Sequence, residues 1–239
     1  MKVVGIYNIK GGVGKTSTAV NLAWLAARDG MRTLLWDLDP QAAATFYLRV
    51  KPKVKKAHQV LAGKLDPLGA VKGSDFDGLD LLPADFAYRN MDILFGGAKK
   101  PRRQLRRMLA PLAGEYDIIL LDCAPSISLV SENVFRASDA LLVPLIPATL
   151  SVRTLGQLLD FLEGEGLDTG SVWPFFSMVD RRKKLHRELS ADLPGQIEGL
   201  LASAIPYRAK VEQMGLYREP LPAFAPSDDA SRAYQALWA

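Results

Sequence analysis

One stretch near the N-terminus decides the fold of this chain: Lys10-Gly11-Gly12-Val13-Gly14-Lys15-Thr16-Ser17. It follows a short apolar run of strand type, Val3–Tyr7, and leads into an amphipathic helical stretch, Thr16–Arg28. Glycines let successive backbone N–H groups curl around an anion, and the N-terminus of the following helix adds partial positive charge. The stretch therefore predicts a phosphate-binding loop. The expected phosphate-contacting residues are Gly11, Gly12, Val13, Gly14, Lys15, Thr16 and Ser17.

The chemistry of this loop depends on its lysines and its hydroxyl groups. Lys15 is expected to reach the β- and γ-phosphates of a nucleotide, and the Thr16 hydroxyl is expected to bind Mg²⁺. The strict pattern GxxxxGK[ST] fails, because Ile9 occupies the position of the first glycine. The chain instead carries KGGxGK[ST], which places a second lysine, Lys10, at the front of the loop.

Outward from the loop, short β-rich runs alternate with longer amphipathic stretches. The expected strands are Val3–Tyr7, Thr33–Trp36, Leu79–Leu82, Ile118–Leu121, Ala140–Leu145 and Val172–Met178. The expected helices are Thr16–Arg28, Arg102–Ala113, Leu129–Ala137 and Val152–Glu163. This alternation predicts one α/β domain over residues 1–239, doubly wound, with a mostly parallel sheet and helices on both faces. Residues 51–77 are mixed and polar, and the proline-rich residues 215–227 favour irregular chain.

A resemblance to a known family spans nearly the whole chain. The loop resembles the deviant Walker A motif of the ParA/MinD family of P-loop ATPases, which has the P-loop NTPase fold. The stretch Asp37-Leu38-Asp39-Pro40-Gln41 is similar to the family's switch I, and Ile118–Pro125 is similar to its Walker B motif and switch II. Leu141–Thr149 and Ile205–Arg208 resemble later family segments, in the same order. Because the chain begins at its first strand, we expect no N-terminal helix-turn-helix domain.

The resemblance implies roles for single residues. Lys10 matches the signature lysine, which crosses a dimer interface to the partner's nucleotide, and Lys15 completes the charged pair. Asp39 matches the residue that positions the attacking water, Asp37 is expected to support the Mg²⁺ shell, and Asp122 is expected to hold Mg²⁺ through water. Taken alone, each aspartate could instead cap a helix, and Lys10 could simply face solvent.

The chain also departs from the family pattern. Gln41 is followed by Ala42-Ala43-Ala44, where the family commonly has Gly-Asn. The resemblance therefore does not assign the switch I contacts of these positions, whereas the water-positioning role of Asp39 is unaffected. By resemblance, Met178, Pro206 and Tyr207 flank the adenine. The resemblance thus implies ATP and Mg²⁺ as ligands and an ATPase of slow intrinsic turnover that a partner stimulates.

The net charge of +4 is modest, but the basic residues are clustered. Lys99–Arg107 holds six of them and Arg181–Arg187 holds five, and neither run contains an acid. Such clusters attract polyanions by releasing counterions, although either could be a solvated helix face. By resemblance, the DNA-contacting residues are Arg181, Arg182, Lys183, Lys184, Arg208 and Lys210.

Two functions fit the motifs. In the first, an ATP-bound homodimer binds double-stranded DNA nonspecifically, and a ParB-like or cargo adaptor protein releases it by stimulating hydrolysis; such a protein is cytoplasmic and nucleoid-associated. In the second, a MinD-like regulator docks on membrane through a C-terminal amphipathic helix. The segment Ser227–Ala239 has one basic residue, Arg232, against two aspartates, so we expect it to pack on the domain instead.

The cysteine count removes several alternatives. Cys123 is the only cysteine, which excludes an intramolecular disulfide framework and a Cys-based zinc site. An iron–sulfur reductase of the same fold would need more than one cysteine per subunit. Beside the Walker B aspartate, Cys123 is expected to be a small buried hydrophobe.

A small-molecule ligase of the same superfamily is a distant third candidate function, because the sequence shows no set of residues that would bind its substrate.

Overall fold

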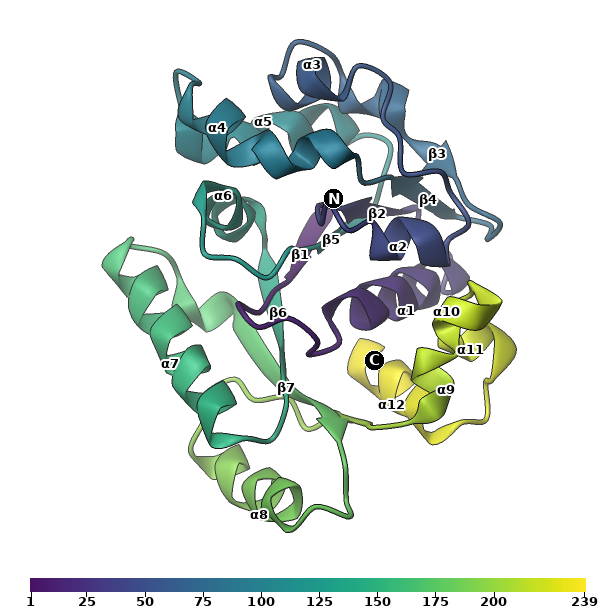
Figure 1. The fold of residues 1–239 in the computed structure, drawn as a ribbon, viewed down its shortest axis with the longest axis vertical. Helices are drawn as coiled ribbons and strands as arrows, with labels where there is room; N and C mark the ends of the chain where they lie inside the picture. The colour runs from purple at the N-terminus through teal and green to yellow at the C-terminus, as the bar shows by residue number, and fades with distance from the viewer.

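The computed structural model describes all residues, 1–239, and its centre is one eight-stranded sheet (Figure 1). The strands are β1 Lys2–Ile6, β2 Thr33–Asp37, β3 Lys72–Gly73, β4 Leu79–Leu82, β5 Ile118–Asp122, β6 Ala140–Leu145, β7 Val172–Val179 and β8 Ala204–Pro206. Their order is β3-β4-β2-β5-β1-β6-β7-β8, and only the β3–β4 pair is antiparallel. The expected single α/β domain with a mostly parallel sheet is confirmed.

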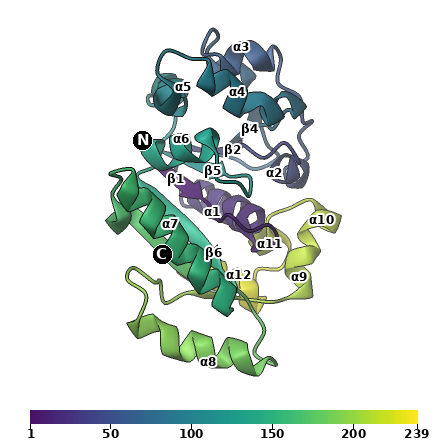
Figure 2. The ribbon, with the colours of Figure 1, turned by 60° about the vertical axis from the view of Figure 1, so that its left-hand side comes forward.

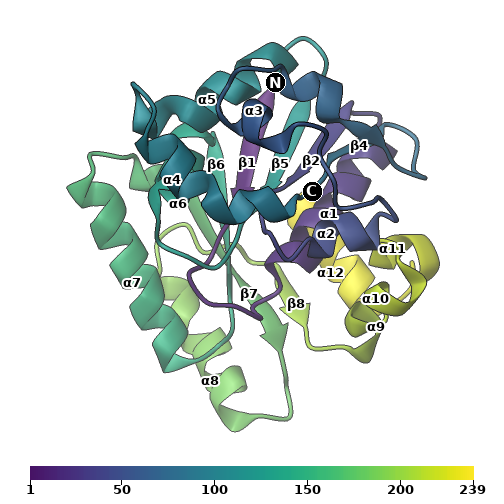
Figure 3. The ribbon, with the colours of Figure 1, turned by 45° about the horizontal axis from the view of Figure 1, so that its top comes forward.

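Helices cover both faces of the sheet (Figures 1 and 3). They are α1 Lys15–Arg28, α2 Ala43–Tyr47, α3 Ala57–Leu61, α4 Met91–Gly96, α5 Gln104–Leu109, α6 Leu129–Ala137, α7 Thr149–Gly164, α8 Lys184–Asp192, α9 Ala209–Glu212, α10 Met214–Tyr217, α11 Leu221–Phe224 and α12 Asp229–Trp238. Side chains of α1 and α12 join one layer of the core, and those of α5, α6 and α7 join the other. None of the helices combines the length and apolar character that crossing a bilayer requires.

The two core layers explain the continuous apolar runs of the sequence. Along β2, Leu34 and Trp36 belong to one layer and Leu35 to the other, because successive strand residues point to opposite faces. All three are fully buried, as parallel strands covered on both sides require.

The structure differs from the expected elements in four of the stretches named above or missing from them. The stretch Arg102–Ala113 is not one helix: α5 is flanked by 3₁₀ turns at Pro101–Arg103 and Ala110–Leu112, because each contains a proline that cannot donate to a helical ladder. The polar residues 51–77 include α3 and β3, and residues 215–227 include α11. β8 was not predicted, since three residues carry too little pattern.

The C-terminal helix packs on the domain. Tyr234 of α12 is buried, and its hydroxyl donates to the hydroxyl of Ser17 in α1 at 3.3 Å. The indole N–H of Trp238 donates to Asp29 at 2.8 Å. This helix therefore lies along α1 and against β8.

Candidate functional site

The phosphate loop joins β1 to α1 and has the backbone conformation that its glycines allow. Gly14 has φ +92°, and a Cβ there would lie 2.8 Å from the Ser177 hydroxyl oxygen on β7. Glycine is thus required by conformation and by the close approach of β7. α1 begins directly after it, at Lys15, so the first N–H groups of the helix face the loop.

Lys15 is buried in the loop, with only 7% of its surface exposed. Its ammonium donates to the carbonyl of Lys10 at 2.8 Å, which holds it across the loop. Burial lowers the pKa of Lys15, and the nearby carboxylate of Asp122 opposes this shift. A cation so placed is partly desolvated, and an anion entering the loop would interact with it strongly.

Asp122, at the end of β5, is the most unusual carboxylate of the molecule. It is 1% exposed, and neither of its carboxylate oxygens has a hydrogen-bond partner. Burial, and next the charge of Asp37, raise its pKa well above the usual range. The hydroxyl of Thr16, which lies close by but outside hydrogen-bonding geometry, and the ammonium of Lys15 oppose the rise. A buried carboxylate without partners is costly, and a bound cation would compensate it.

These residues fit Mg²⁺ bound together with phosphate. Mg²⁺ usually takes one or two protein ligands and completes its octahedron with phosphate oxygens and water. Thr16 and Asp122 supply such a pair of oxygen donors at the loop. No group of three His, Cys, Asp or Glu side chains forms a metal cage in the chain.

Asp37, at the end of β2, lies beside Asp122 in the sheet register, but its oxygens are engaged by the chain. One oxygen accepts the N–H and the hydroxyl of Thr45, at 2.8 and 2.7 Å, and the other accepts the N–H of Asp39 at 3.2 Å. Burial raises the pKa of Asp37 to about 6 despite these bonds. The geometry makes Asp37 the anchor of the segment that carries Asp39; its part in a metal shell stays a prediction.

Asp39 and Lys10 lie on two loops at the same edge of the sheet. Asp39 is half-buried, and one of its oxygens accepts the N–H of Gln41 at 2.9 Å. Lys10 is half-buried, and its backbone N–H donates to Asn8 at 2.9 Å. The Asn8 amide also donates to the carbonyl of Pro144 at 2.9 Å, so it ties the loop to β6. The roles of Asp39 and Lys10 remain predictions, since the structure shows their placement only.

Three supporting residues were not predicted from the sequence: Asn8, Thr45 and Ser177. Asn8 and Ser177 are buried in the structure, and in the sequence they are polar residues at or near the ends of apolar runs. Thr45 accepts the N–H of Ala84 at 2.9 Å while it donates to Asp37. Its partners come from two strand ends, which no local pattern reveals.

Ala42, where the chain departs from the family pattern, has φ +59° and ψ 35°. This left-handed conformation costs roughly 1–2 kcal/mol for a residue with a Cβ, and glycine avoids that cost. We expect Ala42→Gly to raise the free energy of unfolding by about 0.5–1 kcal/mol, since the added freedom of the unfolded chain offsets part of the gain. Urea unfolding measures it. The control Ala43→Gly, at the first residue of α2, should lower the free energy of unfolding, because glycine there only adds freedom to the unfolded chain. A change of the same sign in both variants would contradict the assignment.

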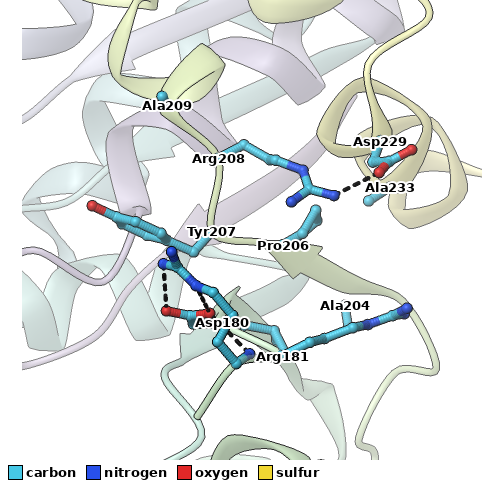
Figure 4. A pocket seen from close by; sticks show the side chains of 11 residues that line it. Asp180, Arg181, Ala204, Pro206, Tyr207, Arg208, Ala209, Asp229 and Ala233 are labelled. Carbon is cyan, nitrogen blue, oxygen red and sulfur yellow. Dashed lines mark hydrogen bonds and ion pairs between the residues drawn. The ribbon is translucent and has the colours of Figure 1, made fainter.

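A hollow of about 720 Å³ lies where β7 and β8 end (Figure 4). Pro206 and Tyr207, two of the residues expected at the adenine, line it, whereas Met178 does not. The guanidinium of Arg182 binds both oxygens of Asp180 at 2.9 Å and lowers the pKa of that carboxyl to about 2.

Several residues expected at DNA lie at or near the same hollow, and they divide by pairing. Arg182 is paired with Asp180, Arg208 with Asp229 at 2.6 Å, and Lys184 with Glu188 at 3.4 Å. The side chains of Arg181, Lys183 and Lys210 form no ion pair, and they are exposed. The unpaired cations are the better candidates for phosphate contacts.

Cys123 is buried beside Asp122, and burial raises the pKa of its thiol above the usual range. The thiol donates only to the carbonyl of Leu121, at 3.5 Å. This environment is that of an inert, small hydrophobe.

Comparison with known proteins places the chain among ATP-binding relatives. A family model described as an AAA domain matches residues 1–165. The chromosome partitioning protein ParA of Caulobacter vibrioides is 30% identical, over 99% of this chain and 92% of its own length. The structure of cobyrinic acid a,c-diamide synthase from Mycobacterium smegmatis, with bound ATP analog and magnesium, is 30% identical, with 91% of each chain covered and a TM-score of 0.77. Apo McdA from Cyanothece shares the fold, at 24% identity, 99% and 98% coverage and a TM-score of 0.84.

Proposed function

The chain belongs to the ParA/MinD family of P-loop ATPases, and from this membership we propose that it is a ParA-like positioning ATPase. Its ATP-bound homodimer binds double-stranded DNA without sequence preference. A ParB-like or cargo adaptor protein stimulates hydrolysis and thereby releases the dimer. The protein so segregates DNA or positions a cargo in the cytoplasm, in association with the nucleoid.

The observation that carries the ATPase part is the buried Asp122 carboxylate. It lies near Lys15 and Thr16, and its oxygens have no hydrogen-bond partner. A hard cation with nucleotide phosphates would satisfy both Asp122 and Lys15 at once. Bound there, Mg²⁺ would neutralise charge on the phosphates during phosphoryl transfer.

Three further roles in ATP hydrolysis are assigned to residues of the chain: phosphate binding, water positioning and charge stabilisation. Lys15 and the loop N–H groups bind the phosphates, and Asp39 orients the attacking water. Lys10 of each protomer reaches the nucleotide of the other and stabilises the charge that develops on the transferred group. No strong general base lies among these residues, so intrinsic turnover is slow and a partner protein completes the site.

The DNA part is supported by Arg181 and Lys183, which are exposed and unpaired near the carboxyl end of β7. Contacts from such side chains go mainly to phosphates, which gives affinity without sequence reading. A MinD-like membrane regulator is less supported, because the apolar side chains of α12 lie against α1.

A second candidate is an ATP-dependent ligase, which the 30% identity to the diamide synthase favours. In that case ATP turnover would depend on a small carboxylic acid and would not respond to DNA.

The test is binding to mixed-sequence duplex DNA with ATP, with ADP and without nucleotide, using Asp39→Ala to hold the ATP-bound dimer. We expect ATP to strengthen binding and raised salt to weaken it steeply. Arg181→Gln with Lys183→Gln should cost about tenfold in the ATP-dependent affinity and reduce the salt slope by about 2.

The matched control is Lys2→Gln with Lys72→Gln, which removes the same charge from exposed lysines without ion pairs. If ATP changes the affinity of neither the wild type nor the Asp39→Ala protein for DNA, the DNA part of the proposal is wrong. Lipid vesicles and carboxylic acids would then be tested as alternative ligands.

A further inference from the structure

The two basic clusters of this chain lie at opposite ends of the molecule. Figures 1 and 2 both show α3, α4 and α5 at one end and α8, which follows Arg181–Lys183, at the other. The cations near α8 belong to the proposed DNA contact. Those around α5 have no part in that function or in the nucleotide site.

Around α5, five cations line one hollow of about 570 Å³. They form what we call the α5 basic surface: Lys99, Lys100, Arg103, Arg106 and Arg107. All five are exposed, and none forms an ion pair. The hollow's only apolar lining residues are Ala62 and Ala98, and Gln104 completes it.

One neighbouring arginine differs from these five in that it is paired. Arg102, from the same run, turns to the other side and pairs with Glu132 and Glu165, each at 2.9 Å. Arg103 and Arg106, three residues apart across the start of α5, face no carboxylate.

The backbone that carries these cations is held in place. The buried Asn133 of α6 accepts the N–H of Leu105 at 3.2 Å and donates to the carbonyl of Pro101 at 2.9 Å. The Gln104 amide donates to the carbonyl of Lys100 at 2.6 Å. The cations are therefore presented from a fixed frame, which lowers the entropy cost of binding.

Further lysines extend the charge over this end of the molecule. The exposed lysines of the segment before α3 and just after it, which also form no ion pair, are Lys51, Lys53, Lys55, Lys56 and Lys64. The carboxylates of Asp66, Asp85 and Asp92 nearby accept backbone N–H groups. These three negative charges offset only part of the ten positive charges named here, five from the hollow and five lysines, so this end keeps a net positive charge.

We propose that the α5 basic surface binds the phosphates of a second stretch of double-stranded DNA, and that it does so without nucleotide. Arginine guanidinium groups suit phosphate oxygens, and a surface without aromatic or large apolar anchors lacks what a protein partner would fill. The surface belongs to one protomer and touches no residue of the phosphate loop, so this contact needs neither ATP nor dimerisation. It is weaker than the contact of the ATP-bound dimer, which uses both surfaces, so hydrolysis still lowers the affinity for DNA. This inference adds to the proposed function, because a protomer with both surfaces links two DNA segments.

The test measures affinity for a short mixed-sequence duplex without nucleotide, at low and at raised salt. Arg103→Gln with Arg106→Gln is expected to lower the affinity about tenfold and to reduce the slope of log affinity against log salt by about 2. Neither side chain forms a hydrogen bond or ion pair, so the unfolding curve should match that of the wild type. The control Lys2→Gln with Arg153→Gln, two exposed cations without ion pairs outside this end, should leave the affinity within about twofold.

Three results would overturn the proposal: no binding without nucleotide, equal affinity of the arginine variant and its control, or competition by poly-glutamate as effective as that of DNA at equal charge. The last result would identify an acidic protein segment as the occupant. ATP-dependent binding of the Asp39→Ala protein that needs Arg181 and Lys183 would still support the proposed function, so the two failures are distinguishable.

Discussion

Replacing Lys15 with alanine is expected to weaken ATP binding by about 100-fold or more, which corresponds to ~3 kcal/mol. The ammonium of Lys15 is buried and already bonded to a loop carbonyl, so it offers phosphate a cation that water screens poorly. Without it, the phosphates would enter a loop that faces the partnerless Asp122 carboxylate. Titration of a fluorescent ATP analogue in the presence of Mg²⁺ measures the change.

Lys10→Ala is the matched control, because it removes a lysine charge from the same loop. That variant should retain most of its ATP affinity but lose ATP-dependent dimerisation and partner-stimulated hydrolysis. Urea unfolding of Lys15→Ala without nucleotide is the check on folding, because this variant also removes the buried cation that lies near the Asp122 carboxylate. ATP affinity within a few-fold of the wild type in Lys15→Ala would contradict the assignment.

The parts of the site that could be predicted from the sequence are those whose residues lie close together in the chain. A phosphate loop needs glycines, a lysine and a hydroxyl within one turn of chain, between a strand and a helix. Asp37 and Asp122 could be placed for the same reason, since each ends an apolar strand, and the ends of parallel strands share one edge of the sheet.

The parts that could not be predicted depend on which residues meet across the fold. Thr45 acts through Asp37 and Ala84, which belong to two different strand ends. Nothing in the run Arg102-Arg103 reveals that the first arginine pairs with Glu132 while the second faces the open hollow. The left-handed conformation of Ala42 is equally invisible, because alanine in a turn predicts no positive φ.

Asp122→Asn should move activity and stability in opposite directions. Mg²⁺-dependent ATP hydrolysis should fall by about 100-fold or more, because the buried carboxylate that fits the metal is lost. The unfolding free energy without nucleotide and Mg²⁺ should rise by about 1–2 kcal/mol near neutral pH, because the native state no longer buries an unpartnered charge. Steady-state phosphate release and urea unfolding measure the two effects.

The pH dependence of stability gives this prediction a sign that can be checked. Burial raises the pKa of Asp122 well above its usual range, so the native state binds more protons than the unfolded chain above about pH 4. The stabilisation associated with the protonated form is complete below that pH and is lost as the pH rises through the native pKa. Asp37, with a pKa of about 6, adds a smaller decline of the same sign. Wild-type stability should therefore fall from about pH 4 through pH 6 and beyond, and Asp122→Asn should flatten that fall.

Asp117→Asn is the matched control, since Asp117 precedes the strand that Asp122 ends. Its exposed carboxylate binds Arg32 at 2.7 Å, which lowers the pKa of Asp117 to about 2, so its contribution is lost as the pH falls. The control should lower stability slightly at neutral pH and leave hydrolysis unchanged. If Asp122→Asn lowered both hydrolysis and stability, Asp122 would be a structural residue. A gain in stability with a loss of hydrolysis is the result expected of a carboxylate that the fold keeps unpaired for a metal ion.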